Sequence, residues 1–345
     1  MGEHAAVYGR PALVAAADPR DRAEVVAAET GVSIELPDFN QNLETSWAEI
    51  ESHAAGLRDA WQRYAEDPTP ERFRAVRSGD AASLVMVALG GVAAELPATE
   101  RPPIRVRVES SLPVGSGFGS SAATAVAVIG GALFFLDGSA PLDRIDRLAF
   151  EVERRQHGLP SGADHRTVLH GGVVWAERRG DRGLEVAPLQ SPSAVPGRLQ
   201  VFQTGQPRET TGEVVAAVKR RRQEEPEAFE RLLDRMQRNT ERFRDLLTES
   251  DPDRIEVGEV IGDYESCLEE LEVVPSRVRE TIREIEAAGG AAKISGAGAL
   301  TGVAAGCLLV HWPVEPPSVV AGGLGDYHRQ SVELGAAGMK LEVLE

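Results

Sequence analysis

The sequence predicts an α+β fold organised as two domains. The chain has 345 residues, which exceeds one domain of ordinary size and suits two. Strand-like and helix-like patterns follow one another along the chain without an internal repeat. Prolines and small polar residues gather at residues 190–197, so we place the boundary between a first domain of residues 1–192 and a second domain of residues 193–345.

The first domain is expected to contain a mixed sheet packed on helices. Its predicted strands are a short one that follows a turn within residues 5–14, two with alternating apolar and polar residues at 32–36 and 104–109, and one after a Gly-Gly turn at 171–176. Its predicted helices span residues 46–64, 70–94, 122–136 and 141–156. The last of them has one apolar face, formed by Leu142, Ile145, Leu148, Ala149 and Val152.

The second domain is expected to combine a second sheet with long helices. A strand is predicted at residues 199–203, and a charged helical region follows from residue 212 to about residue 290. Pro226 and Pro252 divide this region, because proline lacks a backbone N–H group and clashes with the preceding helical turn. Two further strand-like runs follow at residues 301–311 and 339–344.

Composition and charge limit the partners of the chain. A formal net charge of −17 disfavours nucleic acid, whose binding depends on neutralising phosphates with basic residues. No apolar run reaches the roughly 18–20 uncharged residues of a membrane span, since the best candidate, residues 122–136, is too short. The chain does not open with the basic region of a signal peptide, and Cys267 and Cys307 suit two buried thiols. We therefore expect a cytoplasmic location, with no nucleic acid and no membrane as partner.

A glycine-rich run at residues 112–123 is the most informative segment. Gly115, Gly117 and Gly119 alternate before Ser120 and Ser121, and a small-residue helix follows at once. Glycine lets the backbone approach a ligand closely, and the start of a helix offers unpaired N–H groups to an anion. The pattern lacks the lysine of the usual phosphate loop, so a flexible turn and an anion site both remain open at this point.

Two further segments carry polar side chains or glycine near turns. Glu153 lies at the end of a predicted helix, and Asp164 lies in a Pro-Ser-Gly turn eleven residues later. A carboxylate in a turn is often only a turn former, but such a pair can hold a metal ion and orient or deprotonate a hydroxyl group. Residues 293–302 form another glycine-rich turn between a helix and a strand, which on its own is an ordinary connection.

These segments, taken in order, resemble the GHMP family of small-molecule kinases and, within it, the mevalonate kinase group. The opening Gly-Glu-His-Ala-Ala-Val-Tyr-Gly at residues 2–9 is similar to the first motif of that family, residues 113–123 to the second and residues 293–302 to the third. Residues 153–164 and the Gln-Pro-Arg-Glu-Thr at 206–210 are similar to further active-site stretches. The resemblance implies a two-domain GHMP kinase fold, with a ribosomal protein S5 domain 2-like N-terminal domain that binds ATP and a ferredoxin-like C-terminal domain.

The resemblance also implies an activity and a role for each matching residue. The implied activity is ATP-dependent phosphorylation of mevalonate to 5-phosphomevalonate in isoprenoid biosynthesis, with ATP and Mg²⁺ as cofactors and Asp164 acting on the C5 hydroxyl as general base or orienting anion. Ser121 and Glu153 are the implied ligands of Mg²⁺. The implied ATP-binding residues are Pro113, Gly115, Ser116, Gly117, Phe118, Gly119, Ser120 and Ser121. The implied substrate-binding residues are Glu3, His4, Thr210, Gly296, Ala297 and Gly298.

Three departures from the family pattern keep other functions open. The family's Ala-Pro-Gly-Lys strand, whose lysine lies at the transfer site, does not precede Gly2, and the third motif reads Gly-Ala-Gly-Ala-Leu-Thr-Gly. His165 and Arg166 follow Asp164, and we expect Arg166 to stand in for the missing lysine. The alternatives are another GHMP kinase acting on a sugar, homoserine or phosphomevalonate, and a catalytically impaired homologue with a binding role. A homodimer is also left open.

Overall fold

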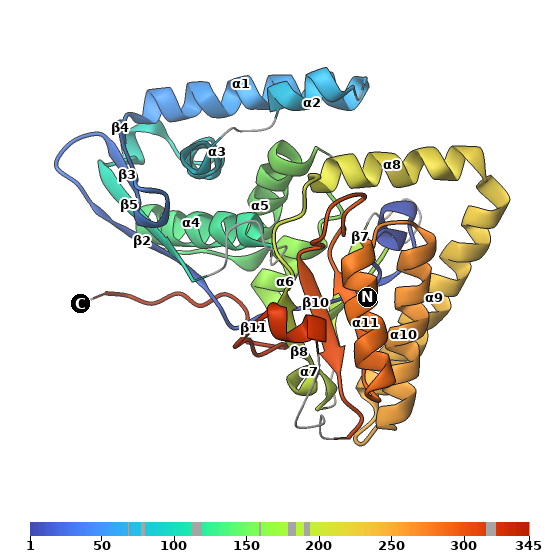
Figure 1. Ribbon diagram of the computed structural model, residues 1–345. Helices are drawn as coiled ribbons and strands as arrows, with labels where there is room; N and C mark the ends of the chain where they lie inside the picture. Colours follow the sequence, from blue (N-terminus) through green and yellow to red (C-terminus); the bar gives the residue numbers. More distant parts are fainter. Residues whose placement is uncertain are drawn as a thin grey trace. The chain divides into compact units, whose positions relative to one another are not determined.

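The computed structural model describes most of the chain and divides it into two compact units (Figure 1). The described residues are 1–67, 69–76, 80–111, 119–158, 160–178, 184–189, 194–314 and 322–344. Among them, unit 1 takes residues 1–18 and 171–337, and unit 2 takes residues 19–111, 119–170 and 338–344. A single cut between residues 192 and 193 does not reproduce these units. Residues 190–193 lie outside the described part of the chain, so the domain boundary placed there stays a prediction.

Unit 2 contains a four-stranded sheet in the order β2-β5-β3-β4. Its strands are β2 (Asp21–Ala27), β3 (Val32–Leu36), β4 (Gln41–Thr45) and β5 (Ile104–Ser110). The sheet is mixed, as expected, because β3 runs parallel to β5 whereas the other two pairs are antiparallel. Val32, Ile34 and Leu36 of β3 are buried at alternate positions, so the inward face of the sheet joins the core of this unit.

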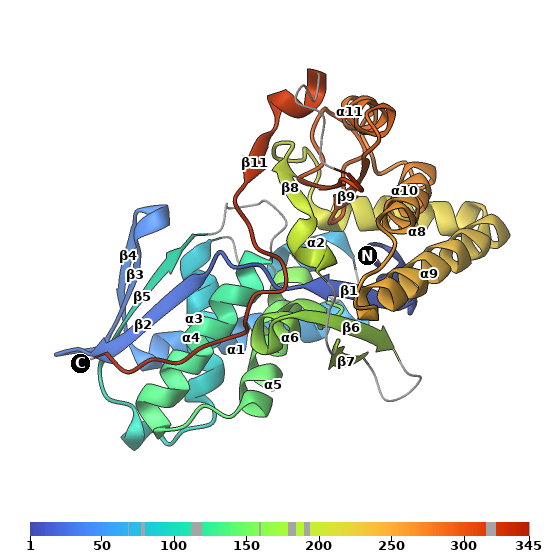
Figure 2. The same ribbon diagram turned by 90° about the horizontal axis from the view of Figure 1, so that it is seen from below.

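The helices of unit 2 pack in layers on one face of that sheet, which Figure 1 and Figure 2 show from two directions. Helices α3 and α4 contact the strands, and α1 and α5 pack on α3 and α4. The helices are α1 (Trp47–Glu66), α2 (Pro70–Val76), α3 (Ala81–Ala93), α4 (Ser120–Asp137), α5 (Leu142–His157) and α6 (Ala163–His170). The helix predicted over residues 70–94 is therefore wrong in one respect, because Asp80 caps the N-terminus of α3 as a separate helix.

Helix α4 is longer than the sequence predicted, so the expectation that this segment is too short to span a membrane needs correction. It extends beyond the apolar residues at both ends and has 18 residues, so by length and composition alone it could cross a membrane. A core helix passes the same test, and 44% of this helix is buried inside the protein. Ala125, Val128, Ile129 and Leu133 are fully buried in the core of unit 2, which accounts for the apolar character of α4 without a membrane.

Unit 1 contains two antiparallel sheets. The first has the order β1-β6-β7, and the second has the order β11-β8-β10-β9. The strands are β1 (Ala12–Ala15), β6 (Val173–Arg178), β7 (Leu184–Pro188), β8 (Gln200–Gln203), β9 (Ala291–Ser295), β10 (Cys307–His311) and β11 (His328–Gln330). The strand predicted at 301–311 is shorter than expected, and residues 339–344 form no strand.

Helices α8 to α11 of unit 1 agree with the predicted charged helical region, and the short α7 lies outside it. They are α7 (Val195–Arg198), α8 (Thr211–Glu224), α9 (Pro226–Thr248), α10 (Arg254–Glu270) and α11 (Ser276–Ala287). Pro226 starts α9, where its missing N–H group costs nothing, and Asp253 caps α10. Short 3-10 turns complete the chain: η1 (Ala5–Tyr8), η2 (Pro37–Phe39), η3 (Ala98–Glu100) and η5 (Gly322–Asp326). Cys267 and Cys307 are buried thiols, as the sequence predicted.

Candidate active site

The N-terminus of helix α4 has the backbone geometry that the glycine run predicted. Gly119 lies at the N-cap position with a φ of 70°, in the left-handed region that favours glycine, and among the described residues no side chain caps the helix there. The N–H groups of the first turn are therefore oriented for an anion. Of the predicted ATP-binding residues, Gly119, Ser120 and Ser121 belong to this described helix start, whereas Pro113, Gly115, Ser116, Gly117 and Phe118 lie outside the described residues.

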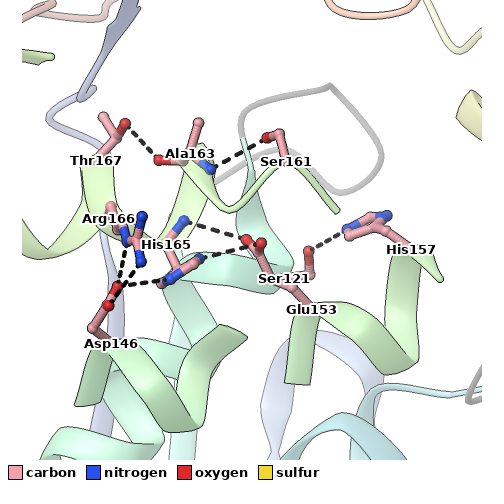
Figure 3. A network of polar contacts seen from close by, with 9 residues as sticks. All are labelled: Ser121, Asp146, Glu153, His157, Ser161, Ala163, His165, Arg166 and Thr167. Carbon is pink, nitrogen blue, oxygen red and sulfur yellow. Dashed lines mark hydrogen bonds and ion pairs between the residues drawn. The ribbon is translucent and has the colours of Figure 1, made fainter. Parts of the chain in front are cut away.

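Ser121 and Glu153 are connected through helix α5. The hydroxyl of Ser121 lies 3.3 Å from Nε2 of His157, at the last position of α5 (Figure 3). Glu153 precedes His157 by one helical turn, so the two side chains emerge on the same face of α5. The two predicted metal ligands therefore come from adjoining ends of two helices in the same unit.

Glu153 is buried, with 3% of its surface exposed, and His165 contacts both of its carboxylate oxygens. The backbone N–H of His165 donates to Oε1 at 3.2 Å, which satisfies a free N–H group in the first turn of α6. The ring atom Nδ1 of His165 lies 3.2 Å from Oε2, an ion-pair contact without the alignment of a hydrogen bond. These contacts give Glu153 a structural role at α6 besides its predicted role toward a metal.

His165 is fully buried between two carboxylates, which the sequence reasoning did not foresee. Its Nε2 lies 2.9 Å from Oδ1 of Asp146, on the opposite side of the ring from Glu153. Burial alone would lower the pKa of His165, but Asp146 and Glu153 raise it to about 9. The ring is therefore an imidazolium cation near neutral pH.

Arg166 completes this network. Its guanidinium contacts both oxygens of Asp146, with Nε 2.8 Å from Oδ1 and Nη2 3.2 Å from Oδ2. His165 and Arg166 together lower the pKa of Asp146 against the effect of burial. This two-point pairing uses N–H groups along one edge of the guanidinium, and the expectation that Arg166 stands in for the family lysine stays a prediction.

Asp164 lies in the first turn of helix α6, not in a loop as the Pro-Ser-Gly sequence suggested. Its side chain is exposed, although surrounding protein atoms still weaken its hydration. That desolvation and the nearby Glu153 charge raise the pKa of Asp164 above its ordinary value of 3.8, while the His165 charge acts in the opposite direction. An accessible carboxylate with a raised pKa is suited to exchanging a proton with a bound hydroxyl group.

The donor set at α4 and α5 fits a magnesium ion. Mg²⁺ prefers oxygen ligands and is commonly held by one or two protein side chains together with substrate phosphates. Among the described residues, His165 makes one contact with each oxygen of Glu153, so the carboxylate keeps lone pairs for a cation. Within the described residues, no three His, Cys, Asp or Glu side chains gather in a way that could hold a metal without a ligand's help. Ser121 and Glu153 therefore match a metal that arrives with nucleotide phosphates.

The structure brings several predicted substrate-binding residues together in unit 1. Nε2 of His4 lies 3.0 Å from the carbonyl oxygen of Ala297, so the first and third motifs are in contact. His4 is buried and has a φ of 60°, an uncommon conformation for a residue with a side chain. Glu3 accepts a hydrogen bond of 2.6 Å from the buried ammonium group of Lys293. Lys293, another residue that the sequence reasoning did not assign, therefore fixes the orientation of Glu3.

Thr210, another predicted substrate residue, lies at the start of α8. Thr210 is the N-cap of α8 and forms a capping box with Glu213, which explains its presence on structural grounds. The neighbouring Glu209 accepts hydrogen bonds from the backbone N–H of Leu300 at 3.2 Å and from the Thr301 hydroxyl at 2.5 Å. Glu209 therefore ties the start of α8 to the third glycine-rich turn, a link that only the folded chain reveals.

Comparison with known proteins identifies the class to which this fold and site belong. The family model for the N-terminal domain of GHMP kinases matches residues 83–172, which include α4, Glu153 and Asp164. A curated mevalonate kinase of Thermococcus onnurineus is 30% identical over 333 residues, covering 94% of this chain and 90% of the relative. The chain belongs to the GHMP kinase family.

Two other proteins agree with this assignment over nearly the whole chain. A curated mevalonate kinase of Pyrococcus abyssi is 28% identical over 351 residues, covering 99% of this chain and 94% of the relative. The crystal structure of the Methanococcus jannaschii mevalonate kinase matches the fold with a TM-score of 0.69 at 17% identity, covering 90% of this chain and 86% of the other. The similarity therefore extends through both compact units.

Proposed function

We propose that this protein transfers the γ-phosphoryl group of ATP to the C5 hydroxyl of mevalonate, giving ADP and 5-phosphomevalonate. The observation that carries the choice of substrate is the near-full-length similarity to mevalonate kinases, which extends through residues of both units. The product belongs to isoprenoid biosynthesis. The arrangement of α4, Glu153 and Asp164 supports phosphoryl transfer as the chemistry, since this reaction needs positioning and neutralisation of charge more than covalent catalysis.

Unit 2 supplies the groups that would act on ATP. The uncapped N-terminus of α4 offers N–H groups and the positive end of the helix dipole to the phosphates. Ser121 and Glu153 would hold Mg²⁺, which neutralises developing charge on the phosphoryl oxygens when it is bound. In a chain with a net charge of −17, these local positive features are needed to bind an anionic nucleotide.

Asp164 is the group proposed to act on the acceptor hydroxyl. As the C5 oxygen forms its bond to the γ-phosphorus, the bond between that phosphorus and the bridging oxygen of ADP breaks, and the hydroxyl proton passes toward Asp164. The raised pKa of Asp164 makes its carboxylate a stronger base than an ordinary aspartate. If the proton leaves late, the same carboxylate serves to orient the hydroxyl.

Unit 1 supplies the residues proposed to bind mevalonate. His4, Thr210 and the turn formed by Gly296, Ala297 and Gly298 match the family's substrate side, and the contact between His4 and Ala297 keeps two of these motifs together. Lys293 orients Glu3 from the core, which leaves Glu3 as a fixed negative group beside His4. We further propose that the enzyme is cytoplasmic and has no membrane partner. Light scattering would decide whether it forms a homodimer.

A substrate panel tests the proposal directly. The purified protein with ATP and Mg²⁺ would be given mevalonate, phosphomevalonate, galactose or homoserine, and ADP release would be measured with a coupled assay. Turnover should be selective for mevalonate, with 5-phosphomevalonate identified as the product by mass spectrometry. Selective turnover of another acceptor would replace mevalonate as the substrate, and nucleotide binding without turnover of any acceptor would favour a binding role.

A further inference from the structure

Four side chains of alternating charge form a chain in unit 2 that ends at Glu153 (Figure 3). Arg166 pairs with Asp146 through two contacts, Asp146 contacts Nε2 of His165 at 2.9 Å, and Nδ1 of His165 lies 3.2 Å from Glu153. Arg166 and Asp146 are partly exposed, at 27% and 29%, whereas His165 and Glu153 are buried, at 0% and 3%. The series therefore runs inward from partly accessible groups to the buried carboxylate.

His165 restrains Glu153 at two separate points. The backbone N–H reaches one carboxylate oxygen and the ring reaches the other, so rotation of the carboxylate would break both contacts at once. The ring itself has little freedom, because Asp146 contacts its far nitrogen and Phe150 lies against it with ring centroids 5.6 Å apart. Groups that contact a metal-binding side chain from behind commonly fix its orientation in this way.

Stability alone does not account for this arrangement. Burying charges costs free energy of solvation, and well-packed apolar residues of similar volume are often as stable as a buried ion pair. A chain of four ionic groups that converges on one carboxylate instead fixes where that carboxylate points. Of these four side chains, Glu153 is the one that the proposed function places beside the nucleotide.

We propose that His165 is a positioning residue that holds the Glu153 carboxylate in the orientation needed to bind the metal–nucleotide complex, with Asp146 holding the His165 ring in turn. The inference rests on the proposed function for the role of Glu153 as a metal ligand. It assigns no proton transfer to His165. The family pattern did not predict it, because it depends on Asp146, which lies outside every motif matched in the sequence.

Metal affinity measured without turnover tests this inference. Mn²⁺ would be titrated into the protein in the presence of the ATP analogue AMPPNP, and free Mn²⁺ would be followed by electron paramagnetic resonance. His165→Gln and Asp146→Asn should each weaken Mn²⁺ binding by roughly 10-fold or more, the range seen for groups that orient metal ligands. Glu153→Gln should weaken it further. Asp143→Asn is the matched control, because it removes an exposed carboxylate from the same helix and should leave the affinity unchanged.

Added metal gives a second readout that a purely structural role would not move. If orientation is the defect, raising the Mg²⁺ concentration should restore kcat of the His165→Gln variant for mevalonate. Thermal melting would verify that each variant is folded. If His165→Gln does not fold, the Mn²⁺ affinity of Asp146→Asn tests the positioning role. Wild-type Mn²⁺ affinity in the folded variants, or in Glu153→Gln, would overturn the inference.

The outcomes separate this inference from the proposed function. Loss of Mn²⁺ affinity in the variants, combined with no mevalonate turnover by the wild-type protein, would leave the positioning role standing and reject the substrate. Normal mevalonate turnover by the wild-type protein, with unchanged Mn²⁺ affinity in the variants, would reject the positioning role and keep mevalonate as the substrate.

Discussion

At the scale of single residues, Glu153 and Asp164 share an environment but differ in accessibility. Glu153 of α5 is buried and held by His165. Asp164 is exposed in the first turn of α6, the helix that also carries His165. The sequence predicted both carboxylates by resemblance, because both lie in a recognisable motif. It could not predict Asp146 or the buried state of His165, since these contacts join positions 19 residues apart that no motif connects.

Replacing Asp164 with asparagine should remove turnover and spare nucleotide binding. Asparagine keeps the size of the side chain but cannot accept the hydroxyl proton, so kcat should fall by about 10²–10⁴-fold, the usual contribution of a positioned acid or base. The Kd for AMPPNP, measured by calorimetry, should change little. A large loss of AMPPNP affinity would instead assign Asp164 to the metal or to the structure. Asp143→Asn again provides the control.

The buried imidazolium predicts how stability depends on pH. The pKa of His165 is about 9 in the folded protein against 6.5 for an unperturbed histidine, so the stabilisation is complete below pH 6.5 and is lost as the pH rises through 9. The charged groups facing the ring are Asp146, Glu153 and, nearby, Asp164. Such a shift corresponds to about 3 kcal/mol between these limits.

Urea denaturation at pH 6, 7.5 and 9 measures this effect as a difference between two proteins. The wild-type protein should lose more unfolding free energy than His165→Gln over this range, because the variant has no proton to lose at that position. Parallel pH profiles for the two proteins would show that folding does not raise the pKa of His165.

At the scale of elements, the local sequence pattern correctly predicted helices and strands whose burial is determined by their own residues. The apolar stripe of α5 is buried as expected at Ile145, Leu148, Ala149 and Val152, although Leu142 is 49% exposed at the helix start. Helix α6 was missed because its first turn is stabilised by Glu153, which lies on another helix. Residues 339–344 were wrongly predicted as a strand because alternation alone does not supply a partner strand.

The third glycine-rich turn offers a test of close packing at this scale. Gly298 has a φ of 70°, and a Cβ atom there would lie 2.1 Å from the carbonyl oxygen of Val273. Gly296 also has a positive φ, of 100°, but a Cβ atom there would meet nothing within 4 Å. Both alanine substitutions should incur backbone strain of about 1–3 kcal/mol, and Gly298→Ala should cost clearly more because of the clash.

Thermal melting of both variants checks this expectation. Gly296→Ala is the matched control for strain without a clash, so the difference between the two variants isolates the contact with Val273. Equal losses of unfolding free energy would show that the turn can move away from Val273 without cost.

At the scale of the whole molecule, the fold class and family could be predicted from the order of the motifs, but the two units could not. The shift in composition near residues 190–197 suggested a single cut. In the structure the chain is again part of unit 1 from residue 171, because β6 pairs with β1 through partners such as Leu13 and Trp175. Pairing between segments this distant in sequence leaves no local signal, so only the folded structure shows which stretches belong together.

This division into units predicts where each ligand should protect the backbone from hydrogen exchange. AMPPNP with Mg²⁺ should slow exchange in peptides of unit 2 that contain Ser120 and Ser121, because their N–H groups lie at the uncapped start of α4. Mevalonate should slow exchange in peptides of unit 1 that contain His4 and residues 296–298. Peptides from α9, whose core positions are already buried, serve as the internal reference. Protection by mevalonate confined to unit 2 would contradict the proposed substrate residues and move the acceptor site to the Asp164 side alone.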